Sequence, residues 1–320
     1  MLHRWKMPIL AIMLIAIGAA YAQGTKTTRI VVAFPPGGPV DLVARVLAEQ
    51  LGKELGETVI VDNKPGANGG IAAQFVAKAQ PDGATLWLTS VGAAAINPSL
   101  YDNLSYDMQR DFAPVSVVVD NVEVLVVNPK DPANNAAEFI AASKAKKEPT
   151  AMASSGVGSI PHLAIEQLAD ATKANLLHIP YKGAAPALSD VMGGQVAGFF
   201  GDIPGLIGFV QGGKLKAIGI AADRRHPLLP DVRTLAEQGI SGVDSNNWYA
   251  LFVPARTPQA IVEALNAAVR RALATPGVRD KLMATGTDPA PTSPQELSAL
   301  VKRDTEKWAK LIKAKGIQGQ

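Results

Sequence analysis

No cysteine occurs in the 320 residues, so disulfide bonds cannot hold this fold together, even in an oxidising compartment. Aromatic residues make up only 5% of the chain, which argues against a sugar-binding groove lined with stacked rings. Charge of one sign is not in large excess, because 31 Lys and Arg face 28 Asp and Glu. The longest basic run, Lys144 to Lys147, is typical of the solvated end of a helix. Nothing in the composition therefore indicates a nucleic-acid partner.

Long apolar runs are also missing, apart from one at the start. Arg4 and Lys6 precede the apolar run Ile9–Ala20, and Ala20-Tyr21-Ala22 supplies small residues where signal peptidase reads them. The run is short for a membrane span, so an uncleaved anchor is the weaker interpretation. We expect a signal peptide over residues 1–22, cleaved after Ala22, and a mature protein that is soluble in the periplasm.

The rest of the chain alternates short β-branched runs with helical segments, which is typical of α/β proteins with mainly parallel sheets. Strands are predicted over residues 29–34, 58–61, 85–89, 115–119, 122–127, 150–153, 176–179, 196–200, 217–221 and 248–253. Helices are predicted over residues 39–55, 70–79, 136–146, 161–171, 184–192 and 204–211. Three further helices, over residues 258–274, 276–285 and 294–313, have no strands between them, so we expect them to cover one domain.

Two glycine-rich loops join a strand to a helix. The first is Pro35-Pro36-Gly37-Gly38, and the second is Ser154-Ser155-Gly156-Val157-Gly158-Ser159. Open α/β sheets bind ligands at this edge, where glycine lets a ligand approach the main chain and the helix N-terminus is partly positive. One such turn is weak evidence, but two indicate an anion site. Neither matches a nucleotide fingerprint, so a carboxylate is the more probable anion.

Catalytic and metal-binding patterns are weak. No histidine pair has metal-ligand spacing, and no GxSxG motif occurs, so we predict neither a metal, nor a cofactor, nor an enzyme. Ser155 or Ser159 with His162 and a carboxylate leaves a periplasmic hydrolase as a remote alternative.

Several segments together resemble one family. They are FPPGGPVD, VDNKPGANGGIAA, PDGATL, INPSLY, DFAPVSVV, SSGVGSIPHLAIE, HIPYKGAAPALSDVMGGQV, LPDVRTLAEQG and WYALFVPARTPQAIVEALN. They are similar to the extracytoplasmic solute receptors of tripartite tricarboxylate transporters, called Bug proteins. The resemblance implies a two-domain fold like that of type II periplasmic binding proteins, with a ligand cleft between the domains. We expect residues 24–123 with 224–320 to form domain 1, and residues 124–223 to form domain 2.

The resemblance also implies which residues contact the ligand. A carboxylate would be held through water and main-chain N–H groups, without a salt bridge. Tyr181 and the Gly183 N–H are expected to form part of the cleft wall, and Asp202 either meets a polar group of the ligand or caps the helix that follows. The full predicted set is Phe34, Pro36, Gly37, Gly38, Asp41, Thr89, Ser90, Ser155, Gly156, Gly158, Ser159, His162, Tyr181, Gly183 and Asp202.

The predicted function is capture of a small carboxylate (a di- or tricarboxylate, an aromatic acid or an amino acid) and its delivery to the membrane permease subunits of a tripartite transporter. The protein is expected to be a monomer that closes around its ligand. An adaptor for a membrane receptor kinase is the alternative. Where the family often has a polar residue, this chain has alanine at positions 93, 94 and 95, which predicts a less polar pocket wall.

Overall fold

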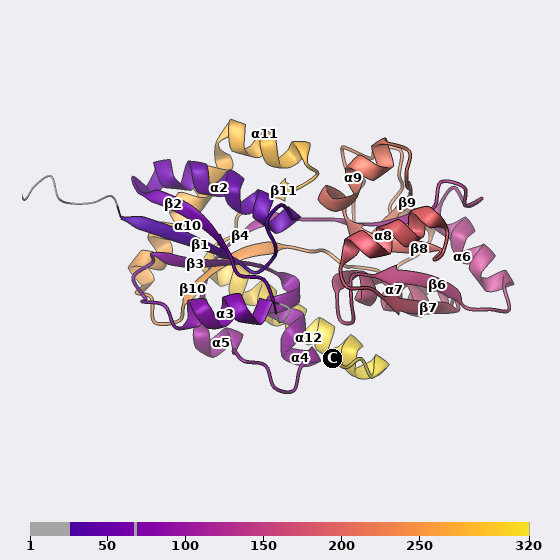
Figure 1. Ribbon diagram of the computed structural model, residues 1–320, viewed down its shortest axis with the longest axis horizontal. Helices are drawn as coiled ribbons and strands as arrows, with labels where there is room; N and C mark the ends of the chain where they lie inside the picture. Colours follow the sequence, from indigo (N-terminus) through magenta and orange to yellow (C-terminus); the bar gives the residue numbers. More distant parts are fainter. Residues whose placement is uncertain (1–25, 67–68, 320) are drawn as a thin grey trace, which may run out of the picture.

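The computed structural model describes residues 26–66 and 69–319. The predicted signal peptide and its cleavage after Ala22 lie outside these residues. The described chain forms two α/β lobes side by side, each built on one sheet with helices on its faces (Figure 1). The predicted two-domain α/β architecture is therefore confirmed.

The first lobe contains a six-stranded sheet in the order β11-β4-β10-β3-β1-β2. Its strands are β1 (Thr27–Val32), β2 (Thr58–Asn63), β3 (Thr85–Ser90), β4 (Phe112–Asp120), β10 (Tyr249–Pro254) and β11 (Asp288–Pro289). Its helices are α2 (Pro39–Leu55), α3 (Gly70–Ala77), the π-helix Gly92–Ile96, α4 (Asn97–Leu100), α5 (Met108–Asp111), α10 (Gln259–Ala274), α11 (Pro276–Ala284) and α12 (Pro294–Lys315). A buried apolar core lies on each face of the sheet.

The second lobe contains a five-stranded sheet in the order β7-β6-β8-β5-β9. Its strands are β5 (Glu123–Val127), β6 (Thr150–Ser154), β7 (Leu176–Pro180), β8 (Gly198–Asp202) and β9 (Lys216–Ile220). Its helices are α6 (Ala136–Ala145), α7 (Ile160–Thr172), α8 (Ala184–Gly193) and α9 (Ile203–Gln211), and a 3₁₀ turn covers Ala236–Gln238. Two apolar cores again cover the two faces.

Most strands of each sheet point the same way. In the first sheet, β1 pairs with β2 and β3 in parallel, whereas β10 runs antiparallel between β3 and β4. In the second, β6 pairs with β7 and β8 in parallel, whereas β5 runs antiparallel between β8 and β9. The reversed strands β5 and β10 are those by which the chain enters the second lobe and returns to the first.

Two chain segments connect the lobes, one at Asn121 and one at Asn247, and we call them the crossings. They are hydrogen-bonded to each other. The Asn121 N–H donates to the Asn247 carbonyl at 3.3 Å, and the Asn247 N–H donates to the Asn121 carbonyl at 2.9 Å. The Asn121 side-chain amide adds a bond to the same Asn247 carbonyl at 3.0 Å. Asn121 is fully buried. Because the crossings form one short two-stranded connection, the relative position of the lobes is determined near these two residues.

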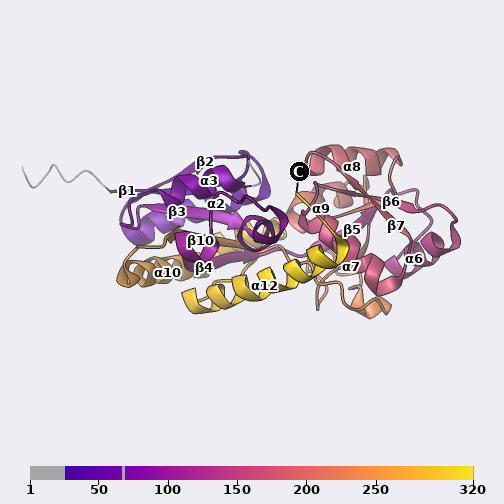
Figure 2. The ribbon, with the colours of Figure 1, turned by 90° about the horizontal axis from the view of Figure 1, so that it is seen from below.

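A second contact joins the lobes on one side. Helix α12 runs along the first lobe and reaches the second, as the yellow helix in Figure 2 shows. Ile160 and Leu163 of α7 belong to the same apolar cluster as Trp308 and Ile312 of α12. Lys315 lies 2.7 Å from Asp170 and 3.1 Å from Glu166, both on α7. The N-terminal half of α7 is therefore held against the first lobe.

The predicted strands and longer helices are confirmed within a few residues at their ends. The sequence pattern missed the two-residue strand β11, the π-helix Gly92–Ile96 and the one-turn helices α4 and α5. Elements this short carry too few residues for a hydrophobic period to be visible.

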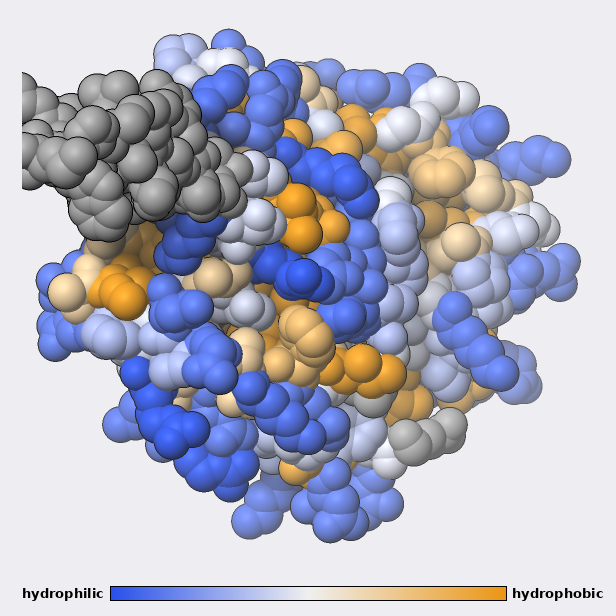
Figure 3. All heavy atoms as spheres, turned by 60° about the vertical axis from the view of Figure 1, so that its left-hand side comes forward, coloured by the Kyte–Doolittle hydropathy of each residue, from blue (hydrophilic) through white to orange (hydrophobic). Residues whose placement is uncertain are grey.

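The surface gives no sign of a membrane span. Among the described residues, no helix is both long and apolar enough to cross a bilayer. On the face shown in Figure 3, apolar side chains form separate orange patches among hydrophilic ones. Exposed large apolar side chains include Ile71 and Phe75 of α3.

The contact between α7 and α12 predicts an effect on molecular shape. Leu163→Ala removes a fully buried side chain from the shared cluster, whereas Leu168→Ala removes one from a cluster inside the second lobe. Each change should destabilise the protein by about 2–5 kcal/mol. Only Leu163→Ala should broaden the distribution of interlobe distances in small-angle X-ray scattering, measured below the unfolding temperature. Identical scattering from the two variants would show that the contact does not hold the lobes.

Candidate functional site

A cavity of about 390 Å³ lies between the two lobes, within the size range of small-molecule sites. The first lobe contributes Phe34, Ser90 and Gly92, and the second crossing contributes Asn247. The other lining residues are Glu123, Ser155, Gly158, Ser159, Ile160, Pro161, Gly183, Ala184, Leu188, Phe199, Gly201, Asp202, Gly205 and Leu206. Most of the wall therefore belongs to the second lobe.

Three helices of the second lobe begin at this cavity. Helix α7 starts after Ser159, α8 after Gly183 and α9 after Asp202, and residues of each first turn line the cavity. The Ser159 hydroxyl accepts from the His162 N–H, and Gly183 takes φ 105°, which favours glycine. The first N–H groups of a helix have no intrahelical acceptor, and the helix dipole makes this end partly positive. The cavity is therefore suited to a small anion.

The charged side chains at the cavity do not attract an anion. Among the described residues that line the cavity there is no Lys or Arg, and two are acidic, Glu123 and Asp202. Part of the wall is apolar, formed by Phe34, Phe199 and Leu206. The alanines at positions 93–95 do not form it, because they are buried in the core of the first lobe. The expectation that these three alanines make the pocket wall less polar is therefore wrong.

The second glycine-rich loop is held by its own hydrogen bonds. The Gly156 N–H donates to the Ser154 hydroxyl at 3.1 Å, and the Gly158 N–H donates to His162 Nδ1 at 3.0 Å. The Gly183 N–H donates to the Ser155 carbonyl at 3.2 Å. These glycine N–H groups are thus not free to receive an anion, contrary to the sequence-based expectation for them. The Ser155 hydroxyl and the remaining first-turn N–H groups of α7, α8 and α9 are the groups left to do so.

His162 supports the loop instead of lining the cavity. Its ring is buried and stacks on His178, with 3.6 Å between ring centroids. Burial lowers the pKa of each of the two rings to about 4. No hydrogen bond joins the His162 ring to Ser155 or Ser159 in the described structure. The arrangement therefore favours a structural histidine over a hydrolase base.

The first glycine-rich loop reaches the cavity only through Phe34. The Asp41 carboxylate, almost fully buried, accepts from the Gly37 N–H at 2.9 Å, from Arg45 and from Asn63. Although burial opposes it, these donors together lower the pKa of Asp41. Asp41 is therefore engaged in holding the loop, and Pro36, Gly37 and Gly38 are not part of the cavity wall.

Of four other predicted residues, the structure places two at the cavity and two away from it. Ser90 and Asp202 line the cavity, but Thr89 and Tyr181 do not. Thr89 is fully buried in β3, and the Tyr181 hydroxyl donates to Asp190 of α8 at 2.5 Å. Seven predicted residues thus meet at the cavity: Phe34, Ser90, Ser155, Gly158, Ser159, Gly183 and Asp202. Whether they contact a ligand stays a prediction.

Asp202 does not cap α9 with its side chain, although it occupies the N-cap position. Its Oδ2 instead accepts from the Tyr249 hydroxyl at 2.5 Å and from Asn247 at 3.3 Å. Glu123, its register partner on β5, is buried, whereas Asp202 is half-buried, and both line the cavity. Burial raises the pKa of both carboxyls. Sequence reasoning missed Glu123, because a lone acid at the start of a strand carries no motif.

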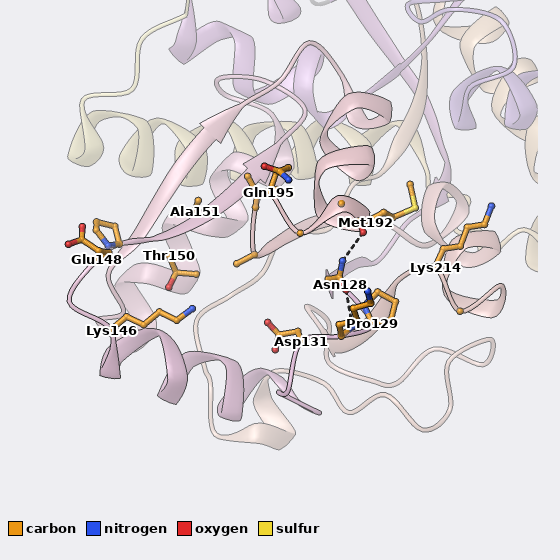
Figure 4. Close-up of a pocket in the computed structure, with 17 residues that line it drawn as sticks. Asn128, Pro129, Asp131, Lys146, Glu148, Thr150, Ala151, Met192, Gln195 and Lys214 are labelled. Carbon is orange, nitrogen blue, oxygen red and sulfur yellow. Dashed lines mark hydrogen bonds between the residues drawn. The ribbon is translucent and has the colours of Figure 1, made fainter.

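A larger cavity, of about 920 Å³, lies at the outer end of the second lobe. Figure 4 shows Lys146, Lys214 and Glu148 around it, and Asn128 donating to the Met192 carbonyl at 2.7 Å. All of its lining residues come from the second lobe, so closure of the lobes would not enclose a ligand there. Among the described residues, no group of three or more acidic or histidine side chains is arranged to hold a metal ion.

The buried histidines predict a pH effect on stability. The unfolded chain binds protons at His162 and His178 near pH 6.5, whereas the folded protein does so only near pH 4. Stability should therefore fall as the pH is lowered from about 6.5 to about 4. The double variant His162→Gln, His178→Gln should show a smaller decrease of the melting temperature over this window, although its stability at pH 7 is reduced. Equal slopes for the two proteins would contradict buried neutral rings.

Comparisons with known proteins agree with this architecture. Residues 43–317 match the family described as Tripartite tricarboxylate transporter family receptor. Protein BugT of Bordetella pertussis is 35% identical over 289 residues, which cover 90% of this chain and 89% of BugT.

Two solved structures are similar over the whole fold. The periplasmic binding protein BugD is 36% identical with a TM-score of 0.80, covering 92% of this chain and 99% of BugD. The Rhodopseudomonas palustris protein Rpa4515 with adipate is 31% identical with a TM-score of 0.84, covering 92% of this chain and 99% of that one. The chain belongs to the tripartite tricarboxylate transporter receptor family of periplasmic solute-binding proteins.

Proposed function

We propose that this protein captures a small carboxylate in the interlobe cavity and delivers it to the permease of a tripartite tricarboxylate transporter. The observation that carries the proposal is the convergence of three helix N-termini on a cavity without basic side chains among the described residues. Such helix ends attract an anion through main-chain N–H groups and the helix dipole.

The relatives support the chemical class. The structure of Rpa4515 contains adipate, a dicarboxylate, and that chain shares the fold over nearly its whole length. The apolar wall of Phe34, Phe199 and Leu206 fits a ligand with a hydrocarbon segment. These two observations together favour a carboxylate with an aliphatic chain over a highly hydroxylated acid.

The mechanism follows from the position of the cavity. We place the domain boundaries at the two connections near Asn121 and Asn247, so that residues 224–246, expected from the sequence in domain 1, belong to domain 2, where Leu235 and Ile240 pack in its core. A ligand held by the second lobe offers contacts to Phe34 and Ser90 of the first, and these contacts favour the closed form. The closed form is the one that the permease would recognise.

The cellular location and the oligomeric state of the protein are also part of the proposal. A cleaved leader would place the mature chain in the periplasm, as expected for a receptor of this family. We propose that it acts there as a monomer, without a cofactor and without turning over its ligand. Incubation with candidate acids followed by product analysis tests the last point.

A matched pair of variants tests the cavity. Gly205 of α9 lines it, and a Cβ there would come no closer than 4.0 Å to the nearest atom, Asp202 Oδ1. Gly205→Leu should therefore fill part of the cavity and weaken adipate binding about tenfold or more, measured by calorimetric titration. Both this change and the control Gly208→Leu, on the same helix, should leave stability unchanged or raise it by up to about 1 kcal/mol.

Gly208 has open space around its Cβ position and does not line the cavity. The control should therefore bind as the wild type does. If Gly205→Leu keeps full affinity for every acid that the wild type binds, the ligand lies elsewhere. Gly158 is less suitable for this test, because a Cβ there would come 2.2 Å from Leu100 and disturb the interlobe contact.

A further inference from the structure

Glu123 is a buried acid in the wall of the proposed ligand cavity, and one of its carboxyl oxygens has no hydrogen-bond partner among the described residues. It is the first residue of β5, is only 1% exposed and lines the interlobe cavity. Its Oε2 is buried without a hydrogen-bond partner in the described part of the chain. An unpaired buried polar atom is costly, so a group that completes its hydrogen bonding on ligand binding would gain that energy back.

The register of the sheet sets Glu123 opposite a second acid. Glu123 on β5 and Asp202 on β8 are direct partners in the antiparallel pair. Asp202 accepts two hydrogen bonds, from Tyr249 and Asn247, which stabilise its charged form. The Glu123 side chain has no such donor. When two neighbouring buried acids share one charge, the acid with the donors keeps the charge and the other keeps the proton.

No nearby cation changes this assignment. The titratable group that raises the pKa of Glu123 is Asp202 on β8, and Glu123 in turn contributes to the raised pKa of Tyr249 on β10. Burial and the charge of Asp202 both raise the pKa of Glu123 well above its usual value. The described lining of the cavity includes no Lys, Arg or His. Burial, the neighbouring Asp202 and the lack of a nearby cation in the described lining all favour the neutral form of Glu123, which carries one O–H donor.

We propose that Glu123 binds the ligand as a neutral carboxylic acid, donating its O–H to an oxygen at the second end of a dicarboxylate. The inference rests on the proposed function and names the class of ligand that the site selects. A monocarboxylate of the same length would bind at the α7 and α8 end but leave Glu123 unsatisfied. A protonated acid suits an anionic acceptor, whereas an ionised one would repel it.

The spacing of the strands fits two separate polar ends. Ser155 follows β6, and Glu123 lies on β5, with β8 between them. Neighbouring strands are about 4.8 Å apart, so β6 and β5 are separated by about 10 Å. A ligand that contacts both positions needs a chain between its polar groups. The apolar residues Phe199 and Leu206 lie in the same wall to meet that chain.

The test compares adipate with hexanoate, which lacks the second carboxylate. For Glu123→Leu, we expect calorimetric titration to show adipate affinity lowered about ten- to a hundredfold, towards that of hexanoate. Glu123→Gln keeps an N–H donor, so it should bind adipate within about threefold of the wild type. Hexanoate affinity should change much less than adipate affinity in Glu123→Leu. Equal affinity of the wild type for the two acids, or full adipate binding by Glu123→Leu, would overturn the inference.

Two further readouts examine the proton itself. Adipate affinity of the wild type should decrease with rising pH as Glu123 ionises, and that of Glu123→Gln should change less. The infrared spectrum of the free wild type at pH 7 should contain a protonated-carboxyl band that Glu123→Gln lacks. Absence of that band overturns the inference whatever ligand binds. If Glu123→Gln loses as much adipate affinity as Glu123→Leu, the site requires a carboxylate, and the O–H donor is also excluded.

These results separate the inference from the proposed function. If no acid in a panel of mono- and dicarboxylates binds the wild type, carboxylate capture itself is wrong. If monocarboxylates and dicarboxylates bind equally well, capture stands and the role of Glu123 is wrong.

Discussion

An anion between these lobes has to be held without a positively charged side chain, and the rest of the site follows from this constraint. Main-chain N–H groups and helix dipoles are weak charges, so they are effective only when fixed in place and shielded from water. The second glycine-rich loop holds the N–H groups at the start of α7 in place. The Gly156 and Gly158 N–H groups bind Ser154 and His162, and the loop that carries them therefore cannot collapse into the cavity. Its internal bonds orient the first turn of α7.

The position of the cavity depends on the connection between the lobes. Asn121 and Asn247 tie the two crossings together, and α7 is packed against α12. Any closing motion must keep the Asn121–Asn247 bonds and must slide or bend at the α7 contact, because packed apolar surfaces resist separation. The floor of the cavity, with Asn247 beside Asp202, lies at the crossings themselves.

The sequence was informative where a residue type has a local physical meaning. The Pro-initiated helices, the glycine loops and the alternating runs predicted an α/β fold, and the family resemblance supplied its two domains and the candidates Ser155, Ser159 and Asp202. The sequence could not show which hydrogen-bonding groups already have a partner within the protein. The Gly158 N–H donates to a histidine ring four residues later, and the Asp41 carboxylate accepts from Arg45 and Asn63. Glu123 was missed because its meaning comes from β8, which follows about 75 residues later in the chain.

The site is also less symmetrical than two similar loops suggested. The helices that begin at the cavity belong to the second lobe, whereas the first lobe adds the Phe34 ring and the Ser90 side chain. The helix ends that attract a charge therefore belong to the second lobe, whereas the apolar lining comes from both lobes, with Phe34 on the first and Phe199 and Leu206 on the second. A ligand can bind to the second lobe while the cavity is open, because the groups that attract its charge are there. We propose that the Phe34 ring covers the ligand's hydrocarbon segment when the first lobe closes, and that this apolar burial, instead of a second set of charges, favours the closed form.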